Sequence, residues 1–309
     1  MHLGFLAERD GILKTGGEIE MVMAGVSYQP GTILRETIHS IRNILGDSLD
    51  DLTVERVVIG VFYTGVKLSN GQGGLCFTPI KAIPGAVCCP SSARAMPASG
   101  ELRGRKATAF LEGMFADQAL RRALGIAVLN ALSATCWQVR PPMNYTLKTG
   151  ANALDQVIIP GEGQVVVVGA LAPFLKVLKR QDCRFTILEL DPATLKKDEL
   201  PFYRPPEDAP EVIPWADLLI ITGTTLINDT LEGLLSVVKP GAQVVVVGPT
   251  ASMLPDAFFR RGVNLLGGTL VTKPDELLDV LAEAGSGYHF YGRAAEMMVL
   301  RLSDHGGTI

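Results

Sequence analysis

Each of three short apolar runs in the second half of the sequence is followed by small or hydroxyl-bearing residues that could bind a ligand. These residues are Gly169, then Thr222, Gly223, Thr224, Thr225 and Asn228, and then Gly248, Pro249 and Thr250. Glycine lets a ligand approach the backbone, Thr and Asn add side-chain hydrogen bonds, and backbone N–H groups at a helix start favour anions. The pattern predicts a binding site for a small anion. The alternative is that Thr and Asn only cap the helix that follows the turn.

Two acids after a fourth apolar run suggest a different ligand. Glu189 lies 20 residues after Gly169, and Asp191 follows shortly afterwards. In dinucleotide-binding folds, an acid about 20 residues beyond the glycine turn holds a ribose hydroxyl. The full G-x-G-x-x-G fingerprint is absent after Val168, which disfavours an enzyme that clamps a pyrophosphate. A single glycine and an acid also fit an S-adenosylmethionine-dependent methyltransferase, whereas an acid at a strand end is commonly just a solvated carboxylate.

Cys88 and Cys89 are the residues that could bind a soft metal directly. Adjacent Cα atoms lie about 3.8 Å apart, which is closer than most disulfides allow, whereas two neighbouring thiolates can hold a soft metal. Zinc sites usually combine C-x₂₋₄-C pairs into a set of four ligands, and the sequence has no second pair. The alternative is that both cysteines are small apolar residues of a loop.

The apolar runs of the second half predict buried parallel strands. The runs are Gln164–Val168, Arg184–Leu188, Asp217–Ile221, Gln243–Val247 and Val263–Leu266. Continuous rather than alternating hydrophobicity is typical of strands that are buried on both faces. Helical segments are predicted between most of the strands, at Ala172–Lys179, Asn228–Val238, Pro255–Arg260 and Pro274–Ala284. This alternation predicts a doubly wound α/β sheet, which binds ligands beyond the carboxyl ends of its strands.

The first half of the sequence predicts a smaller α+β unit. Four apolar residues between Leu34 and Leu45, spaced four, three and four apart, indicate one face of a helix. Asn70-Gly71, between the strand-like segments Val57–Ser69 and Leu75–Thr78, predicts a β-hairpin. The uncharged stretch Leu124–Trp137 predicts a buried helix. We therefore expect two domains, an α+β domain at residues 1–155 and a parallel-sheet domain at residues 156–309.

The composition excludes several classes of protein. The 309 residues include 28 Lys plus Arg and 32 Asp plus Glu, a net charge of −4, and the pI of about 5.7 argues against a nucleic-acid partner. No apolar stretch reaches the roughly 20 residues of a membrane helix, so we expect no membrane partner. Five sparse cysteines fit the reducing cytoplasm. Because 47% of residues are hydrophobic and only 19% are charged, we expect a homo-oligomer.

Two stretches of the second half carry a family resemblance. ADLLIITGTTLINDTLEGLL and VVVVGPTASMLPDAFFRRGVNLLGG resemble the Rossmann-like C-terminal domain of the putative heavy-metal chelation family, with its Thr-Gly-Thr turn, Asn-x-Thr and Gly-Pro-Ser/Thr. Gly60–Thr78 and Gly125–Ala134 are similar to the family's other domain, which has an enolase N-terminal-like fold. The resemblance implies a cleft between the domains, with Gly73, Gly74 and Asn130 opposite the strand ends. It also implies metal handling, but not enolase activity, because a fold alone does not carry function.

The sequence as a whole favours a cytoplasmic protein that binds a small anionic molecule or a metal chelate in an interdomain cleft and acts in metal homeostasis. The alternative is an enzyme that uses a nucleotide-like cofactor, such as an S-adenosylmethionine-dependent methyltransferase. A metal sensor built on Cys88 and Cys89 is a third hypothesis.

Overall fold

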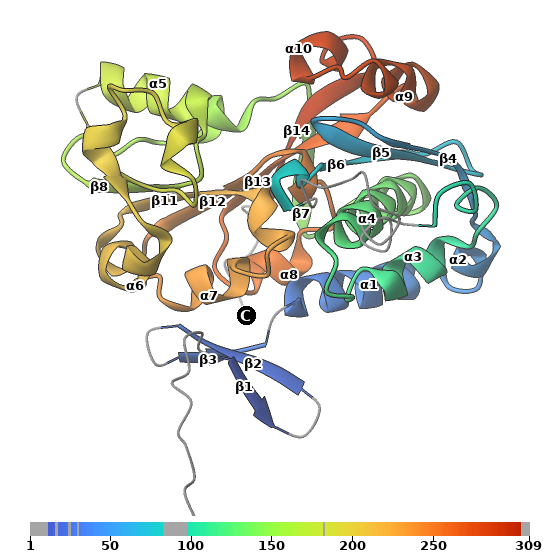
Figure 1. Cartoon of the computed structure of the whole chain (residues 1–309), viewed down its shortest axis with the longest axis horizontal. Coiled ribbons are helices and arrows are strands. Elements are labelled where there is room, and N and C mark those ends of the chain that lie inside the picture. Colours follow the sequence, from blue (N-terminus) through green and yellow to red (C-terminus); the bar gives the residue numbers. More distant parts are fainter. Residues whose placement is uncertain are drawn as a thin grey trace, which may run out of the picture.

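The apolar runs of the second half form part of one eight-stranded sheet in the computed structural model of the chain (Figure 1). The structure describes residues 12–15, 18–23, 26–29, 31–82, 98–181 and 183–303. The strands of the large sheet lie in the order β10-β9-β8-β11-β12-β13-β14-β7. Their bounds are β7 Tyr145–Thr149, β8 Gln164–Val168, β9 Arg184–Leu188, β10 Tyr203–Arg204, β11 Leu218–Thr222, β12 Gln243–Val247, β13 Leu265–Val271 and β14 Ala295–Leu302. Strands β8 to β13 are parallel, whereas β14 and β7 extend one edge by antiparallel pairing.

The central strands of the large sheet are buried on both faces, as their continuous apolar runs predict. Side chains alternate between the two faces of a strand, so Val165 and Val167 of β8 join one core and Val166 joins the other. Helix α5 (Ala172–Arg180) covers the first face, and α7 (Leu231–Ser236) and α8 (Asp256–Phe259) cover the second. The segment with six prolines, residues 192–214, contains no long crossover helix; besides short 3-10 turns it forms β10 and the four-residue α6 (Ala209–Val212).

A second, antiparallel sheet of three strands lies in the first half of the chain. It consists of β4 (Val54–Ile59), β5 (Tyr63–Leu68) and β6 (Gly73–Phe77), and the predicted hairpin at Asn70-Gly71 is confirmed between β5 and β6. The predicted strand Val57–Ser69 is interrupted at residues 60–62, where β4 turns into β5. Helix α4 (Ala119–Val139) packs on this sheet, with α1 (Thr32–Leu45), α2 (Ser48–Asp51) and α3 (Ala107–Gly113) in the same layer.

Each sheet is completed by the other half of the chain. Strand β7, which precedes residue 155, pairs with β14 at the edge of the large sheet. Helix α9 (Pro274–Ala282), from the second half, packs on β4 and β5 (Figure 1). The predicted fold class is confirmed: the protein is a mixed α/β protein with a large, mostly parallel sheet and a smaller antiparallel sheet. The domain boundary at 155/156 stays a prediction.

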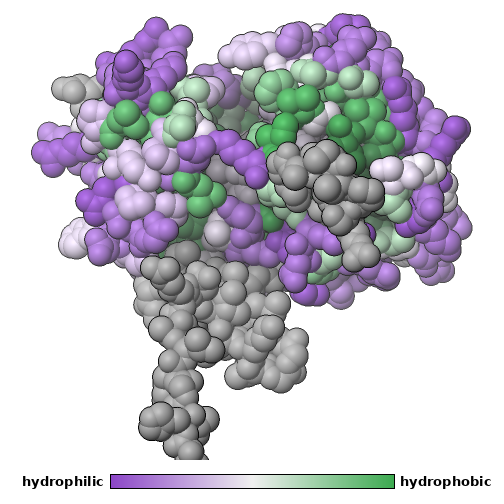
Figure 2. Space-filling model, in the orientation of Figure 1, coloured by the Kyte–Doolittle hydropathy of each residue, from purple (hydrophilic) through white to green (hydrophobic). Residues whose placement is uncertain are grey.

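Figure 2 shows one face of the molecule, with hydrophilic residues around its rim and apolar patches nearer its middle. Helix α10 (Gly287–Phe290) follows α9, and a third sheet of β1 (Ile12–Thr15), β2 (Glu18–Met23) and β3 (Val26–Tyr28) lies beside α7. Among the described residues, no helix combines the length and the apolar character needed to cross a membrane.

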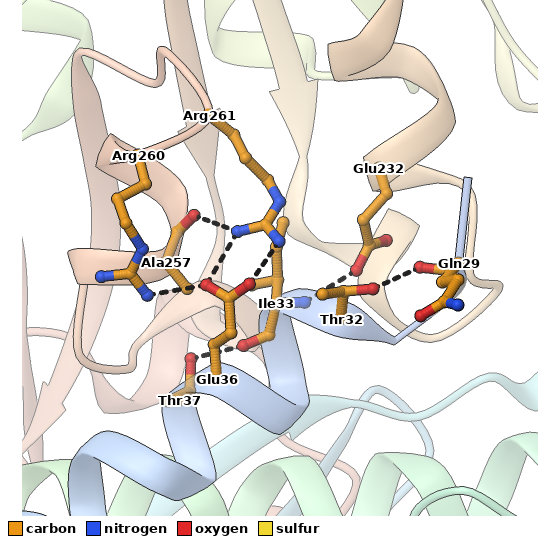
Figure 3. Close-up of polar contacts among 9 residues, drawn as sticks. All are labelled: Gln29, Thr32, Ile33, Glu36, Thr37, Glu232, Ala257, Arg260 and Arg261. Carbon is orange, nitrogen blue, oxygen red and sulfur yellow. Dashed lines mark hydrogen bonds and ion pairs between the residues drawn. The ribbon is translucent and has the colours of Figure 1, made fainter. Parts of the chain in front are cut away.

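Helix α1 is attached to the large-sheet half by two carboxylates (Figure 3). Glu36 forms a bidentate pair with the guanidinium of Arg261, at 2.6 and 3.0 Å, and accepts a further hydrogen bond of 2.6 Å from Arg260. Buried Glu232 of α7 accepts a hydrogen bond of 3.0 Å from the backbone N–H of Ile33, in the first turn of α1. The hydrogen bond from Arg261 lowers the pKa of Glu36 to about 2, against the opposing effect of burial.

We expect Glu36→Gln to cost about 1–2 kcal/mol of unfolding free energy at pH 7, after allowance for solvent screening of this partly exposed side chain. Because the folded pKa is depressed below the ordinary 4.5, the pair stabilises the protein above that pH and loses its effect as the pH falls towards 2. The difference between wild type and variant, measured by urea unfolding, should shrink by more than half between pH 7 and pH 3. Burial also raises the pKa of Glu232. Because Glu232 titrates in both the wild type and the variant, its contribution cancels from the difference between them. The control is Glu112→Gln, which makes the same change at an exposed position of α3. If the loss of unfolding free energy in Glu36→Gln did not depend on pH, the prediction would be contradicted.

Candidate functional site

The order of the parallel strands creates a place where a ligand can enter the large sheet. The chain passes outward from β8 to β9 and β10, then returns to the other side of β8 to form β11. The connections after β8 and β11 therefore leave in opposite directions, and a crevice opens beyond the carboxyl ends of these two strands. Ligands of doubly wound sheets bind at such a switch point.

A cavity of about 110 Å³ lies at this point, and we call it the switch-point cavity. Its lining residues are Val168, Gly169, Leu188, Glu189, Leu190, Pro206, Ala209, Thr222, Thr224, Thr225, Asn228, Thr230 and Leu234. Six of the residues that the sequence marks as ligand-binding are among them: Gly169, Glu189, Thr222, Thr224, Thr225 and Asn228. The structure therefore brings together the strand ends after β8, β9 and β11.

Glu189 is fixed against the turn that follows β8. Its Oε2 accepts a hydrogen bond of 2.8 Å from the N–H of Ala170, and its Oε1 accepts one of 3.1 Å from the N–H of Asp191. Gly169, at φ +96°, allows this turn because a Cβ there would lie only 2.8 Å from Cγ2 of Thr222. A carboxylate held by two backbone donors presents its remaining lone pairs in a fixed direction.

The opposite wall is a turn of hydroxyl side chains after β11. The hydroxyls of Thr222 and Thr224 lie 3.1 Å apart, and the Thr225 hydroxyl donates to the carbonyl oxygen of Thr222 at 2.8 Å. Thr222 caps the short 3-10 helix Gly223–Leu226, in addition to lining the cavity. Thr230 donates to Oδ1 of the exposed Asn228 at 2.7 Å.

Sequence reasoning missed Thr230 and the apolar part of the lining. Thr230 belongs to the Asn-x-Thr pattern, which is the signal that could have found it. Pro206 and Ala209 come from the proline-rich segment after β9, whose path no periodicity indicates. Leu190 is 70% exposed and lines the cavity at its outer end.

Arg122 of α4 holds the hydroxyl-bearing turn in place from the other half of the chain. Its side chain forms an ion pair with Asp229 and donates to the carbonyl oxygens of Ile227, at 3.0 Å, and Met114, at 3.1 Å. Asp229 has the unusual φ of +58°, and burial raises the pKa of its carboxyl although Arg122 opposes this. The position of Asn228 and Thr230 thus depends on an ion pair between the two halves.

Five more predicted residues lie where the two halves pack together, whereas Gly74 packs on α4 within the first half and Gly223 packs against the turn after β12. Asn130 of α4 donates from Nδ2 to the carbonyl oxygens of Leu75, at 2.8 Å, Pro249, at 3.1 Å, and Thr250, at 3.2 Å. Gly248, Pro249 and Thr250 form the turn after β12, and the Thr250 hydroxyl accepts from the N–H of Phe77 at 3.2 Å. Gly73 and Gly74 contact α9 and α4 respectively. Apart from Gly74, these residues join the halves, and none of them lines the switch-point cavity.

Asp191 lies next to the cavity wall rather than in it. It forms an ion pair with Lys81 of the small-sheet half, which lowers the pKa of Asp191, and its Oδ1 accepts from the N–H of Ala193 at 2.9 Å. Cys88 and Cys89 lie outside the residues that the structure describes.

Comparisons with known proteins agree with this architecture. Two family models, DUF364 at residues 152–300 and DUF4213 at residues 42–133, both carry the description "Putative heavy-metal chelation". An uncharacterized protein of Methanocaldococcus jannaschii is 30% identical over 181 residues, 56% of this chain and 63% of that protein. This chain therefore spans less than two thirds of that relative's length.

Solved structures of two proteins of unknown function share the fold. One is a DUF364-family protein from Pyrococcus horikoshii, which superposes with a TM-score of 0.69 at 17% sequence identity. The superposition covers 88% of this chain and 100% of that protein's chain. Another is a protein of the same family from Desulfitobacterium hafniense, with a TM-score of 0.65 at 18% sequence identity. That superposition covers 87% of this chain and 98% of the other. The two family models, which share one description, together match most of the chain, and by them the chain belongs to the putative heavy-metal chelation family.

Proposed function

We propose that the chain binds a small polar molecule or a metal chelate in the switch-point cavity, and that it does so in the cytoplasm. The observation that supports this most is the convergence of six strand-end residues, predicted from three separate runs of sequence, on one cavity. The cavity also has an apolar side, with Leu188, Leu234 and Ala209 buried in its wall. Apolar walls with a few convergent polar groups are the usual composition of ligand sites.

The charge of the lining favours an uncharged or donor-rich ligand over a free small anion. Among the described residues that line the cavity, Glu189 alone carries a charge. A carboxylate repels an anion and attracts hydroxyl, amine or cationic groups. A metal chelate fits this lining when its organic part offers such donors.

Direct ligation of a heavy metal does not fit the described residues. Soft metals prefer thiolate and imidazole ligands, and in the part of the chain that the structure describes no three His, Cys, Asp or Glu side chains are placed to share an ion. Cys76 and Cys136 are buried, and burial raises the pKa of each thiol to about 12. A thiol with so high a pKa stays protonated and is a poor metal ligand.

Thiol labelling tests this picture of the cysteines. In a Cys88→Ser/Cys89→Ser variant three thiols remain, and we expect one, the half-buried Cys183, to react rapidly with a disulfide reagent. Cys76 and Cys136 should react only when the protein unfolds. Peptide mapping identifies the labelled residue, and rapid labelling of Cys76 or Cys136 would contradict their burial.

The binding proposal is tested by removing one hydroxyl from the cavity. Thr224→Val keeps the shape of the side chain but removes its oxygen, whereas Thr146→Val makes the same change on exposed β7, far along the sheet from the cavity. We expect a small-molecule fraction of a cell extract to raise the melting temperature of the wild type and of Thr146→Val. Thr224→Val should lose most of that shift. An equal shift in all three proteins would overturn the assignment of the cavity.

A methyltransferase is the second candidate, and the placement of Glu189 beside Gly169 favours it. An acid in this position can accept hydrogen bonds from the ribose of an S-adenosyl cofactor. Calorimetric titration with S-adenosylhomocysteine should then give a heat that Glu189→Ala abolishes. No heat with the wild-type protein would remove this candidate.

A further inference from the structure

We infer that the ligand of the switch-point cavity is a nucleoside that carries no phosphate next to its ribose. This inference rests on the ligand binding proposed above and names the chemical class of the ligand. It depends on three features of the cavity: the way Glu189 is held, the use of the backbone donors after β8, and the apolar outer wall.

Glu189 is placed and oriented to bind a vicinal diol. It directly follows β9, whose last residue Leu188 pairs with Val168 at the end of β8, so the carboxylate lies at the crevice itself. Both of its oxygens accept a backbone hydrogen bond, from Ala170 and from Asp191. Each oxygen keeps a further lone pair, and the two together can accept from the neighbouring hydroxyls of a ribose. This is the position in a doubly wound sheet from which an acid binds ribose.

The turn after β8 offers no backbone N–H to a phosphate between residues 169 and 173. Gly169 donates to the carbonyl oxygen of Leu188 at 2.8 Å, Leu171 to that of Gly169 at 2.8 Å, and Ala172 to that of Ala170 at 3.0 Å. The N–H of Ala170 is used by Glu189, and residue 173 is a proline, which has none. In dinucleotide-binding folds these donors face the pyrophosphate.

The charge at this turn has the wrong sign for a phosphate as well. The carboxylate of Glu189 lies within hydrogen-bond distance of the turn, where a pyrophosphate would otherwise be bound. The described lining residues include no Lys, Arg or His that could offset it. The same carboxylate that attracts a diol therefore rejects a phosphate.

The outer wall suits the flat, weakly polar base of a nucleoside. Leu190 is 70% exposed, and the half-buried Pro206 lies with it in the lining. At about 110 Å³ the cavity is smaller than the roughly 300–1,000 Å³ of typical ligand pockets, so it encloses only part of such a molecule. We assign the enclosed part to the ribose, between Glu189 and the threonines, and the exposed apolar wall to the base.

Isothermal titration with a matched set of compounds tests the inference. The set contains adenosine, guanosine, cytidine and uridine, then the 2′-deoxy form and the 5′-monophosphate of the tightest binder, and NAD. We expect one of the four nucleosides to bind, and its deoxy form, its monophosphate and NAD to bind at least tenfold more weakly. Glu189→Gln should weaken nucleoside binding at least tenfold and reduce the penalty for the 5′-phosphate. Glu162→Gln, the same change at an exposed acid before the amino end of β8, should bind like the wild type, and melting temperatures confirm that both variants are folded.

The outcomes separate this inference from the proposal that it rests on. Equal affinity for the nucleoside and its monophosphate overturns the exclusion of phosphate, and equal affinity for the deoxy form overturns the role of the diol. If no nucleoside binds, while the extract still stabilises the wild type and not Thr224→Val, the ligand class is wrong and the binding site stands. If neither test gives a signal, both are wrong.

Discussion

Replacing Gly74 with alanine is expected to destabilise the folded protein by about 3 kcal/mol or more. Gly74 lies in β6 where the strand crosses α4, and a Cβ at this position would lie 2.5 Å from the backbone nitrogen of Ala131 and closer still to the carbonyl oxygen of Ala127. These are backbone atoms in the middle of a 21-residue helix, so they cannot yield as the end of a flexible side chain could. The methyl group therefore forces the strand and the helix apart. Urea unfolding followed by circular dichroism measures the loss.

Gly113→Ala is the matched control for this experiment. Gly113 ends α3 at a negative φ, and an added Cβ would meet nothing within 4 Å. Alanine favours helix over glycine by up to about 1 kcal/mol, so this variant should be as stable as the wild type or slightly more stable. If Gly74→Ala were as well tolerated as Gly113→Ala, the close packing of β6 on α4 would be incorrect.

Replacing Arg122 with methionine is expected to cost about 3–5 kcal/mol, because it leaves the carboxylate of Asp229 largely buried and without its partner. The Arg122 and Asp229 side chains are only 13% and 19% exposed, so water screens the pair weakly. The substitution also removes donors from the carbonyl oxygens of Met114 and Ile227. The turn that carries Asn228 and Thr230 should loosen, and the melting-temperature shift in the extract test should fall with it.

A double-mutant cycle separates the lost ion pair from the lost packing. Asn tolerates a positive φ such as that of residue 229, so Asp229→Asn removes the charge without straining the turn. The double variant Arg122→Met/Asp229→Asn should therefore be more stable than Arg122→Met alone. A double variant that is less stable by the full sum of the two single losses would show that the pair contributes nothing.

The centre of the large sheet was predictable because its strands are buried on both faces. Runs such as Gln164–Val168 and Gln243–Val247 have almost no polar residue, and continuous burial leaves few structures other than a parallel sheet. The edge strands gave no such signal. Tyr145–Thr149 contains Lys148 and two threonines and is mostly exposed, so its pairing with β14 depends on a neighbour about 150 residues away in sequence. No local pattern in the sequence of β7 indicates which strand it pairs with.

The candidate site was predictable where its residues follow predictable strands. Gly169, Glu189 and Thr222 each lie at a strand end, and the topology brings those ends together. The apolar wall was not predictable, because Pro206 and Ala209 reach the cavity through an irregular segment. Gly73 and Gly74 illustrate a second limit. The residues that they contact belong to α4, α9 and β13. In the sequence, a glycine that allows close packing of another element cannot be distinguished from a glycine that allows a ligand to approach.

The exchange of β7 and α9 between the two halves has a consequence for the newly synthesised chain. The last strand of the small sheet ends at Phe77, but the helix that covers β4 and β5 begins only at Pro274. At roughly 5–20 residues per second, a ribosome needs on the order of 10–40 s to make the intervening chain. During that time Gly65 and its neighbours on β5, which α9 later contacts through Leu278 and Leu281, face water. The first half of the protein therefore depends on a segment that is synthesised long after it, and until then it exposes the kind of apolar surface that chaperones bind.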